Sequence, residues 1–351
     1  MPKRAFASST GSASDAPPGP EEQPAGTAGE PPAEVADRPP AATAAELTDH
    51  MIVRPRSDAP TVGWRRAVHA ASGGVINLGA GPVERRRHDL AARIRRELPG
   101  PHQIAVTSIK GGVGKTTVTA LLGLALAEHR GDRVVALDAD PDAGTLADRL
   151  TGEPGTTVRD LLDHIEDVQA LPDVARFTSL AGRLQVLASE QDAARSVAIN
   201  RAEYEQVCTV LSRFYNIVVT DSGTGMMHSA MHGTLATTDS LVVVGALTLD
   251  SASRASKTLD WLLAHGHRDL VARAVVVLSG DRTSREVDTT RLRAHFSTRC
   301  RAVVDIPHDP HLAVGGTIEM AALRPATADA VLELAALVAD EFGQPGGPNS
   351  V

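Results

Sequence analysis

The chain of 351 residues contains only two cysteines, and aromatic residues make up 3% of it. Cys208 and Cys300 lie far apart and form no CxxC motif, which argues against a cysteine-ligated cluster within one chain and favours buried free thiols. Scarce aromatic residues leave little material for a surface on which nucleic-acid bases could stack. The formal net charge of −8 argues against a protein that coats nucleic acid, although it permits a local basic patch.

Long apolar runs are also missing. No run reaches the roughly 18 apolar residues that a membrane-spanning helix needs. The first ten residues, MPKRAFASST, lack the apolar core of a secretory signal. We therefore expect a soluble, cytoplasmic protein, whose contact with a membrane would be peripheral and run through a partner.

Lysine is scarce as well, because only four of the 35 basic residues are lysines. Two of these four, Lys110 and Lys115, lie in the single stretch SIKGGVGKTT. A compact ammonium group is therefore expected to be needed at both positions, where a planar guanidinium would not fit.

The composition changes along the chain. Residues 1–60 hold 11 of the 22 prolines and little to bury, which predicts a disordered tail. Residues 61–100 form a basic linker with an amphipathic helix, and 84–97 carry six arginines against three acidic residues. That helix either contacts DNA, anionic lipid or a secretion partner, or packs its apolar face on the main domain while its arginines face water. The main domain is expected at 101–343, and 344–351 as a flexible C-terminus.

From His102 onward, short runs rich in Val, Ile, Leu and Ala alternate with helical patterns. This alternation predicts an α/β fold with a mostly parallel, doubly wound sheet that is covered by helices on both faces. Ligands of such sheets bind at the carboxyl ends of the strands. Strands are expected at 103–108, 133–138, 184–188, 216–221, 240–246, 273–279 and 302–306, and helices at 116–129, 201–213, 251–265, 287–298 and 327–342.

The first strand leads into a glycine-rich loop and then a helix, the setting of a phosphate-binding loop. The usual motif has a glycine at position 109, where this chain has Ile109. Main-chain N–H groups of the loop and the helix dipole would surround phosphate oxygens, Lys115 would reach the β- and γ-phosphates, and Thr116 would hold Mg²⁺. A chance glycine-rich turn is the alternative. The expected nucleotide-contacting residues are Gly111, Gly112, Val113, Gly114, Lys115, Thr116 and, near the α-phosphate, Thr117.

The stretch KGGVGKTT resembles the deviant Walker A motif of the MinD/ParA family of ATPases. The resemblance implies binding of ATP and Mg²⁺ in a P-loop NTPase fold. It also implies a nucleotide-sandwich homodimer, in which Lys110 reaches the phosphates of the partner subunit. A cation supplied in this way acts as an arginine-finger equivalent, so that hydrolysis depends on dimerisation.

Further motifs follow the next strands. VVALDADPDAG resembles switch I of the family, which implies that Asp140 orients the attacking water and that Asp138 belongs to the Mg²⁺ shell. DADPD as a simple polar turn is the alternative. VVTDSGTG resembles switch II, with Asp221 at the Mg²⁺ hydration shell. The family often reads adenine with an asparagine on a late strand, but AVVVLSGDR has none, so the preference for adenine is inherited from the resemblance. Pro307 in VVDIPHDPHL matches the family element beside the base.

Taken together, GWRRAVH, the loop, the two switch motifs and IPHDPHL resemble actinobacterial MinD/ParA-like ATPases that occur with type VII (ESX) secretion. This resemblance implies an ATP-hydrolysing, dimerising switch that works with a protein partner in secretion. Two alternatives stay open: a partition ATPase whose dimer binds DNA non-specifically, and a nucleotide-binding module without turnover. His228 and His232 have zinc-ligand spacing but lack the glutamate of HExxH, so interface or surface histidines are the favoured interpretation.

Overall fold

The computed structural model describes residues 63–108, 111–140, 144–152, 155–190, 199–223, 229–280 and 287–343. The predicted tail (1–60) and the predicted flexible C-terminus (344–351) lie outside these ranges. Lys110 and His228 also lie outside them.

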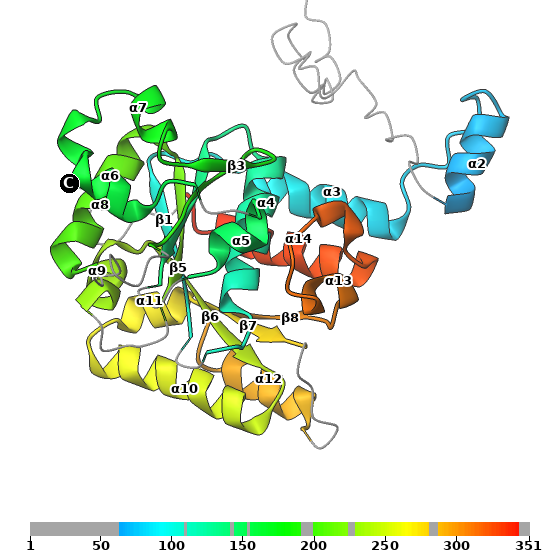
Figure 1. The fold of residues 1–351 in the computed structure, drawn as a ribbon. Helices are drawn as coiled ribbons and strands as arrows, with labels where there is room; N and C mark the ends of the chain where they lie inside the picture. Colours follow the sequence, from blue (N-terminus) through cyan, green and yellow to red (C-terminus); the bar gives the residue numbers. More distant parts are fainter. Residues whose placement is uncertain are drawn as a thin grey trace, which may run out of the picture. The chain divides into compact units, whose positions relative to one another are not determined.

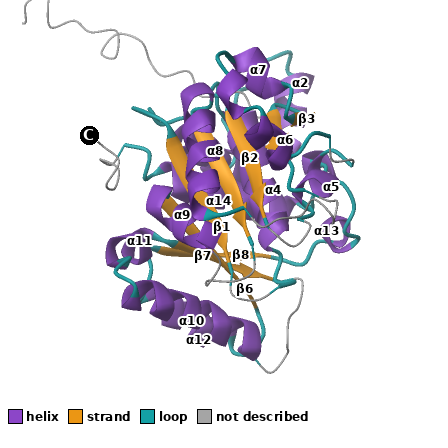
Figure 2. Ribbon diagram, turned by 60° about the vertical axis from the view of Figure 1, so that its left-hand side comes forward, coloured by secondary structure: helices purple, strands orange, loops and turns teal. Residues whose placement is uncertain are grey.

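One eight-stranded sheet forms the centre of the described residues, in the order β3-β4-β2-β5-β1-β6-β7-β8. All neighbouring strands are parallel except β3, which pairs antiparallel with β4 at one edge. Figure 2 shows the strands as one layer with helices on both sides, which confirms the predicted fold class. The strands are β1 His102–Thr107, β2 Val134–Ala139, β3 Ser179–Ala181, β4 Leu184–Leu187, β5 Ile217–Ser222, β6 Ser240–Ala246, β7 Val275–Ser279 and β8 Ala302–Ile306.

The predicted helices are present with ends that shift by a few residues, and several short helices join them. The edge strand β3 and the short helices escaped the sequence patterns because each is too brief to show a period. The α-helices are α2 Gly63–Ala71, α3 Pro82–Ile94, α4 Lys115–His129, α5 Leu146–Leu150, α6 Val158–Asp163, α7 Leu171–Ala175, α8 Arg201–Phe214, α9 Ser229–Thr237, α10 Leu249–Ala264, α11 Arg268–Arg273, α12 Thr289–Ser297, α13 Pro310–Ala313 and α14 Pro325–Ala339, with short 3-10 helices at Ile165–Asp167 and Met320–Ala322.

Successive residues of the central strands enter different core clusters, as the twofold alternation of a strand requires. On β1, Ile104 and Val106 pack with α4 and α14, whereas Ala105 points to the side of α10. On β5, Val219 joins the first cluster and Val218 joins a third cluster around α8. Burial on both faces explains why the strands appear as nearly continuous apolar runs in the sequence.

Helix α3 packs against α14, which in turn lies against α4 (Figure 1). Its apolar residues Leu90 and Ile94 are buried in the main core. This outcome agrees with the alternative in which the helix packs on the domain. It also means that α3, the second helix in the predicted linker 61–100, contributes to the core.

Most of the arginines of α3 and of the turn after it are exposed, as that alternative expects, but they also meet carboxylates of the domain. Four of the six in 84–97 form ion pairs with carboxylates of α14 and of Asp340 just after it. The pairs are Arg86–Glu333 at 2.9 Å, Arg87–Asp329 at 2.5 Å, Arg93–Asp340 at 2.5 Å and Arg96–Asp340 at 3.1 Å. The acidic last helix thus neutralises most of the basic patch that suggested DNA or lipid.

Cys208 and Cys300 are both buried and free, as predicted. Burial raises the pKa of the Cys208 thiol to about 12, so it stays protonated and unreactive at neutral pH. Among the described helices, none has the length and apolar character required to cross a bilayer.

His102 begins β1 at the end of the strand opposite the glycine-rich loop. Its Nε2 lies 2.8 Å from Ser240 Oγ, and its ring packs edge-on against Phe342 at 4.7 Å between centroids. Burial, helped by the nearby positive charges of Arg273 and Arg130, lowers the pKa of His102 from 6.5 to about 4. The folded protein therefore holds this side chain neutral at pH values where the unfolded chain takes up a proton.

We expect His102 to make the fold sensitive to mild acid. Its contribution to the free energy of unfolding is complete above pH 6.5 and is lost as the pH falls towards 4, because the unfolded state then binds the proton first. The slope is at most about 1.4 kcal/mol per pH unit. The free energies of unfolding in urea of the wild type and of His102→Gln, measured at pH 5, 6, 7 and 8, should become more similar as the pH falls. Parallel curves would contradict this assignment.

Candidate nucleotide-binding site

The carboxyl ends of β2, β5 and β1, which are neighbours in the sheet, meet at one edge. The register places Asp138 of β2 directly beside Asp221 of β5, and Asp221 beside Val106 of β1. Helix α4 starts at this edge with Lys115. Pairing between distant segments therefore brings together the carboxylates and the lysine that the sequence singled out.

The glycine-rich loop between β1 and α4 takes a backbone shape that other residues rarely adopt. Gly112 has φ 73° and Gly114, which precedes α4, has φ 93°. A side chain at either position would strain the turn, so glycine is needed at both. Gly111 is exposed, Val113 is buried beneath the loop, and Thr116 and Thr117 are half-buried in the first turn of α4.

Lys115 is almost completely buried between two carboxylates. Its Nζ lies 2.7 Å from Asp221 Oδ1 and 3.7 Å from Asp140 Oδ2. Thr119, one helical turn after Lys115, places its hydroxyl 3.2 Å from the same Asp221 oxygen. A buried ammonium group must be paired, and these carboxylates supply the compensating charge.

Asp138 is fully buried, and its carboxylate accepts two main-chain hydrogen bonds, from Asp140 N and Leu146 N, each of 3.1 Å. Burial, together with the negative charge of Asp221, raises the pKa of Asp138 to about 7. In this arrangement Asp138 shapes the turn after β2 and the start of α5. A Cβ atom at Gly144 would overlap its carboxylate, so this turn requires glycine.

The residues at this edge fit a magnesium ion. Asp221 Oδ2 is buried, and it has no hydrogen-bond partner among the described residues. Mg²⁺ prefers oxygen ligands and usually combines one or two carboxylates with waters and substrate phosphates. Asp221 and the Thr116 hydroxyl are the groups that would hold it, whereas Asp138, which the resemblance also assigned to the Mg²⁺ shell, has each of its oxygens hydrogen-bonded to the main chain. The described residues contain no cluster of three or more His, Cys, Asp or Glu that could form an all-protein metal cage.

Pro307 lies at the same edge, where β8 ends beside β7. Gly280, after β7, donates its main-chain N–H to Ile306 O at 2.7 Å. A Cβ at Gly280 would lie 2.9 Å from His308 N and 3.1 Å from Pro307 Cα, which requires glycine there. The segment 281–286 lies outside the described residues, so Ser279, Gly280 and Pro307 are the parts of the expected base side that the structure places.

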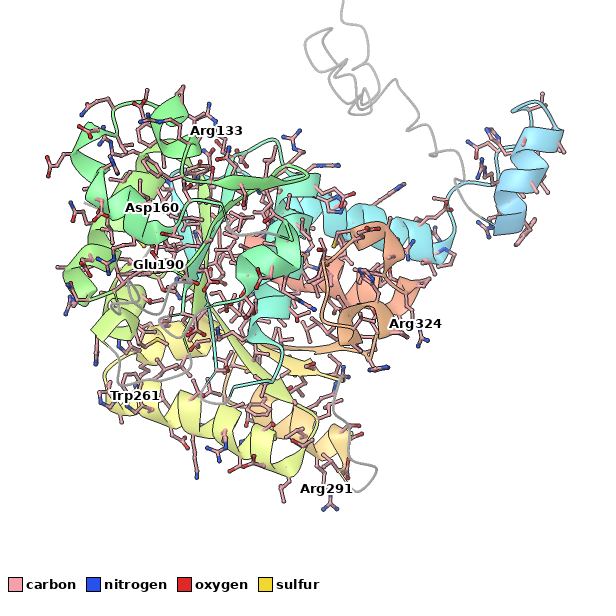
Figure 3. All side chains as sticks on the ribbon, viewed as in Figure 1. Arg133, Asp160, Glu190, Trp261, Arg291 and Arg324 are labelled. Carbon is pink, nitrogen blue, oxygen red and sulfur yellow. The ribbon has the colours of Figure 1, made fainter. Side chains whose placement is uncertain are left out.

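His232 of α9 is exposed, and its ring lies 5.9 Å from that of Trp261 on α10, a residue that is labelled in Figure 3. This position agrees with the surface interpretation of His232. Its predicted companion, His228, is outside the described residues.

Two polar residues near the loop were not identified from the sequence. Thr119 carries a weak signal, because it lies four residues after Lys115 and therefore on the same helix face. Arg149 of α5 donates to Thr117 Oγ1 at 3.1 Å, and nothing in its local sequence marks it. Its partners lie far away along the chain.

The family model that matches this chain is the CobQ/CobB/MinD/ParA nucleotide binding domain, over residues 104–313. The chain belongs to this family. The match contains all of the loop, β2, β5 and Pro307, so the family membership rests on the segments that form the site. It also confirms the MinD/ParA resemblance seen in the sequence.

Among the curated relatives, the ESX-1 secretion-associated protein EspI of Mycobacterium tuberculosis is 40% identical to this chain over 291 residues. The alignment covers 81% of this chain and 43% of EspI, so the chain spans less than half the length of that relative. The septum site-determining protein MinD of Helicobacter pylori is 30% identical over 141 residues, which is 40% of this chain and 52% of that protein.

Solved structures show the same fold. The ParA family ATPase from Chlorobium tepidum has a TM-score of 0.59 at 18% identity, over 67% of this chain and 98% of that one. The cell division ATPase MinD of Pyrococcus furiosus has a TM-score of 0.54 at 23% identity, over 68% of this chain and 98% of that one. At these identities the likeness concerns the fold alone.

We expect Gly144→Ala to disturb the site, although the substitution adds only one methyl group. The new methyl group would displace the Asp138 carboxylate from its two main-chain donors, with a loss of roughly 1–3 kcal/mol of stability. Gly155→Ala is the matched control, because a Cβ there meets no atom within 4 Å. Thermal unfolding of both variants tests this prediction, and equal melting temperatures would contradict it.

Proposed function

We propose that this chain is an ATP-dependent switch that binds ATP with Mg²⁺, closes into a homodimer and separates again on hydrolysis. The observation that carries the proposal is the convergence of Lys115, Asp140 and Asp221 at the start of α4, behind a loop shaped by glycines. A cation that a phosphate can capture and a carboxylate that can receive Mg²⁺ lie side by side there.

Nucleotide binding would exchange the partners of these charges. Lys115 would leave Asp221 for the β- and γ-phosphates, and Asp221 would turn to the hydration shell of the bound Mg²⁺. Thr116 would supply a hydroxyl to the ion, while Thr117 would meet the α-phosphate. The loop N–H groups and the N-terminal end of α4 add positive potential at the same place. A MinD of Pyrococcus horikoshii with the same fold was solved as a complex with Mg-ADP, which is consistent with this proposal.

Hydrolysis would depend on two residues with separate tasks. Asp140, at the end of β2 and already 3.7 Å from Lys115, would orient the attacking water. Lys110 would come from the second subunit and stabilise the charge that develops on the transferred phosphate. Since Lys110 lies outside the described residues, its role rests on the KGGVGKTT motif.

A role in type VII secretion is supported by the 40% identity to EspI, whose name associates it with ESX-1 secretion. The partner would then be a protein that distinguishes the ATP-bound dimer from the ADP-bound monomer. The alternative of a DNA-binding partition ATPase loses part of its support, because four of the six arginines in 84–97 pair with α14 or Asp340. ATP-dependent retention on DNA that weakens steeply with salt would restore that alternative.

Substitution of the two loop lysines should affect nucleotide binding and ATP turnover separately. Lys115→Ala should abolish binding of Mg-ADP in titration calorimetry, because the phosphates lose their buried cation. Lys110→Ala should bind normally but release no phosphate from ATP. Lys257→Ala, which removes an exposed lysine of α10, is the control and should match the wild type in both assays.

A mixing experiment tests whether Lys110 acts across a dimer. An Asp140→Ala subunit keeps Lys110, and a Lys110→Ala subunit keeps Asp140. Their heterodimer therefore has one complete site, so an equimolar mixture should release phosphate although neither variant does so alone. An inactive mixture, or normal turnover by Lys110→Ala alone, would refute the trans role.

Asp140→Ala should hold the protein in its ATP-bound dimer, because phosphates bind while the attacking water lacks the carboxylate that orients it. Light scattering with ATP and Mg²⁺ should give the mass of two chains, and the same sample with ADP should give one. A variant that stays monomeric with ATP would count against the switch. A wild type that binds ATP but never releases phosphate would favour the module without turnover.

A further inference from the structure

Arg149 occupies the last turn of α5, a short helix that begins just after the Asp138 turn and lies against α4 (Figure 1). The residue is only 7% exposed although it carries a guanidinium group. Its Nη2 donates to Thr117 Oγ1 at 3.1 Å and to the Leu312 carbonyl at 3.2 Å. Leu312 belongs to α13, which follows Pro307. One side chain thus joins the first turn of α4 to the segment beside the expected base.

The direction of the first hydrogen bond has a consequence for the site. Arginine has donors but no acceptor, so Thr117 Oγ1 must accept in this contact. The single proton of the Thr117 hydroxyl is then directed to a different acceptor. A phosphate oxygen in front of the first turn of α4 is such an acceptor, and the positive guanidinium behind the hydroxyl makes it a stronger donor.

The segment that contains Leu312, the second partner of Arg149, is held by further contacts. The Arg149 carbonyl accepts from Ile318 N at 2.8 Å, which ties α5 to the chain after α13. Gly315 has φ 81°, and a Cβ there would come within 3.6 Å of Arg149 Nη1. Asp309 caps α13 and also accepts from the main chain of Arg324, which is labelled in Figure 3. The segment that Arg149 reaches is therefore held in one place.

Arg149 is also linked to the carboxylates of the site. Leu146, the first residue of α5, donates its N–H to Asp138, and Arg149 follows one turn later. One short helix thus carries both the contact to Asp138 and the contact to Thr117. A displacement of the turn after β2 would move both.

We propose that Arg149 is a positioning residue for bound nucleotide, which aims the Thr117 hydroxyl at the α-phosphate and fixes α13 beside the base. This inference rests on the proposed function. Because ATP and ADP share the α-phosphate and the base, loss of Arg149 weakens both nucleotides by the same factor. Lys115 would contact the β- and γ-phosphates, and ADP has no γ-phosphate, so loss of Lys115 would not weaken the binding of ATP and ADP by the same factor.

The test is a double-mutant cycle on Mg-ADP affinity, measured by titration calorimetry with Arg149→Met, Thr117→Val and the double variant. Each single change should weaken binding about tenfold, the loss of one charge-assisted hydrogen bond. If Arg149 acts through Thr117, the double variant should be little weaker than either single variant. Arg183→Met is the control, since Arg183 donates to Ala127 O at the other end of α4 and should not affect affinity.

Arg149→Lys keeps the cycle valid if the methionine variant does not fold. Its aliphatic stem preserves the packing, but one ammonium group does not reproduce the planar fork that meets both partners. Effects that simply add, to about a hundredfold in the double variant, would overturn the inference, and so would an unchanged affinity of the Arg149 variants. If the wild type binds neither Mg-ADP nor Mg-ATP, both the proposed function and this inference fail. If the wild type binds nucleotide but the effects of the two substitutions add, only this inference fails.

Discussion

The buried ion pair between Lys115 and Asp221 is the interaction on which the arrangement of the site depends. It joins the helix after the glycine loop to the end of β5, which is the sheet neighbour of β1, the strand before that loop. An isolated buried charge costs several kcal/mol, so neither residue can lose its partner unless another opposite charge arrives. Under the proposed function, phosphate and a divalent cation arriving together would satisfy both sides. This one contact would then couple nucleotide binding to metal binding.

The carboxylates around this pair occupy different environments in spite of their similar place in the sequence. Asp138 is enclosed and hydrogen-bonded to the main chain, and its pKa is raised, whereas Asp140 is half-buried beside Lys115. Asp221 faces the lysine with one oxygen and has its other oxygen buried without a partner. Environment, more than residue type, separates a carboxylate that shapes a turn from ones that can take part in chemistry.

Charge also organises the side of the domain formed by α3, α4 and α14. The arginines of α3 and the turn after it meet the carboxylates of the last helix and of Asp340, so that ion pairs join α3 to the C-terminal helix. A single exposed pair contributes little, but several pairs around buried Leu90 and Ile94 add to an apolar contact that already exists. The positive charge of the basic segment and the negative charge of the acidic segment offset each other, so the net charge of the protein stays moderate.

The sequence by itself determined the α/β class, most strand positions and the identity of the phosphate loop, because these depend on local periodicity and on glycines at fixed spacing. It also placed Asp138, Asp140 and Asp221 at strand ends. Only the tertiary structure decided that Asp138 lies beside Asp221, since that register is set by pairing between β2 and β5. It alone decided that the arginines near α3 face carboxylates. Arg149 stayed hidden because its partners are 32 and 163 residues away, and a contact of that range leaves no mark in the neighbouring sequence.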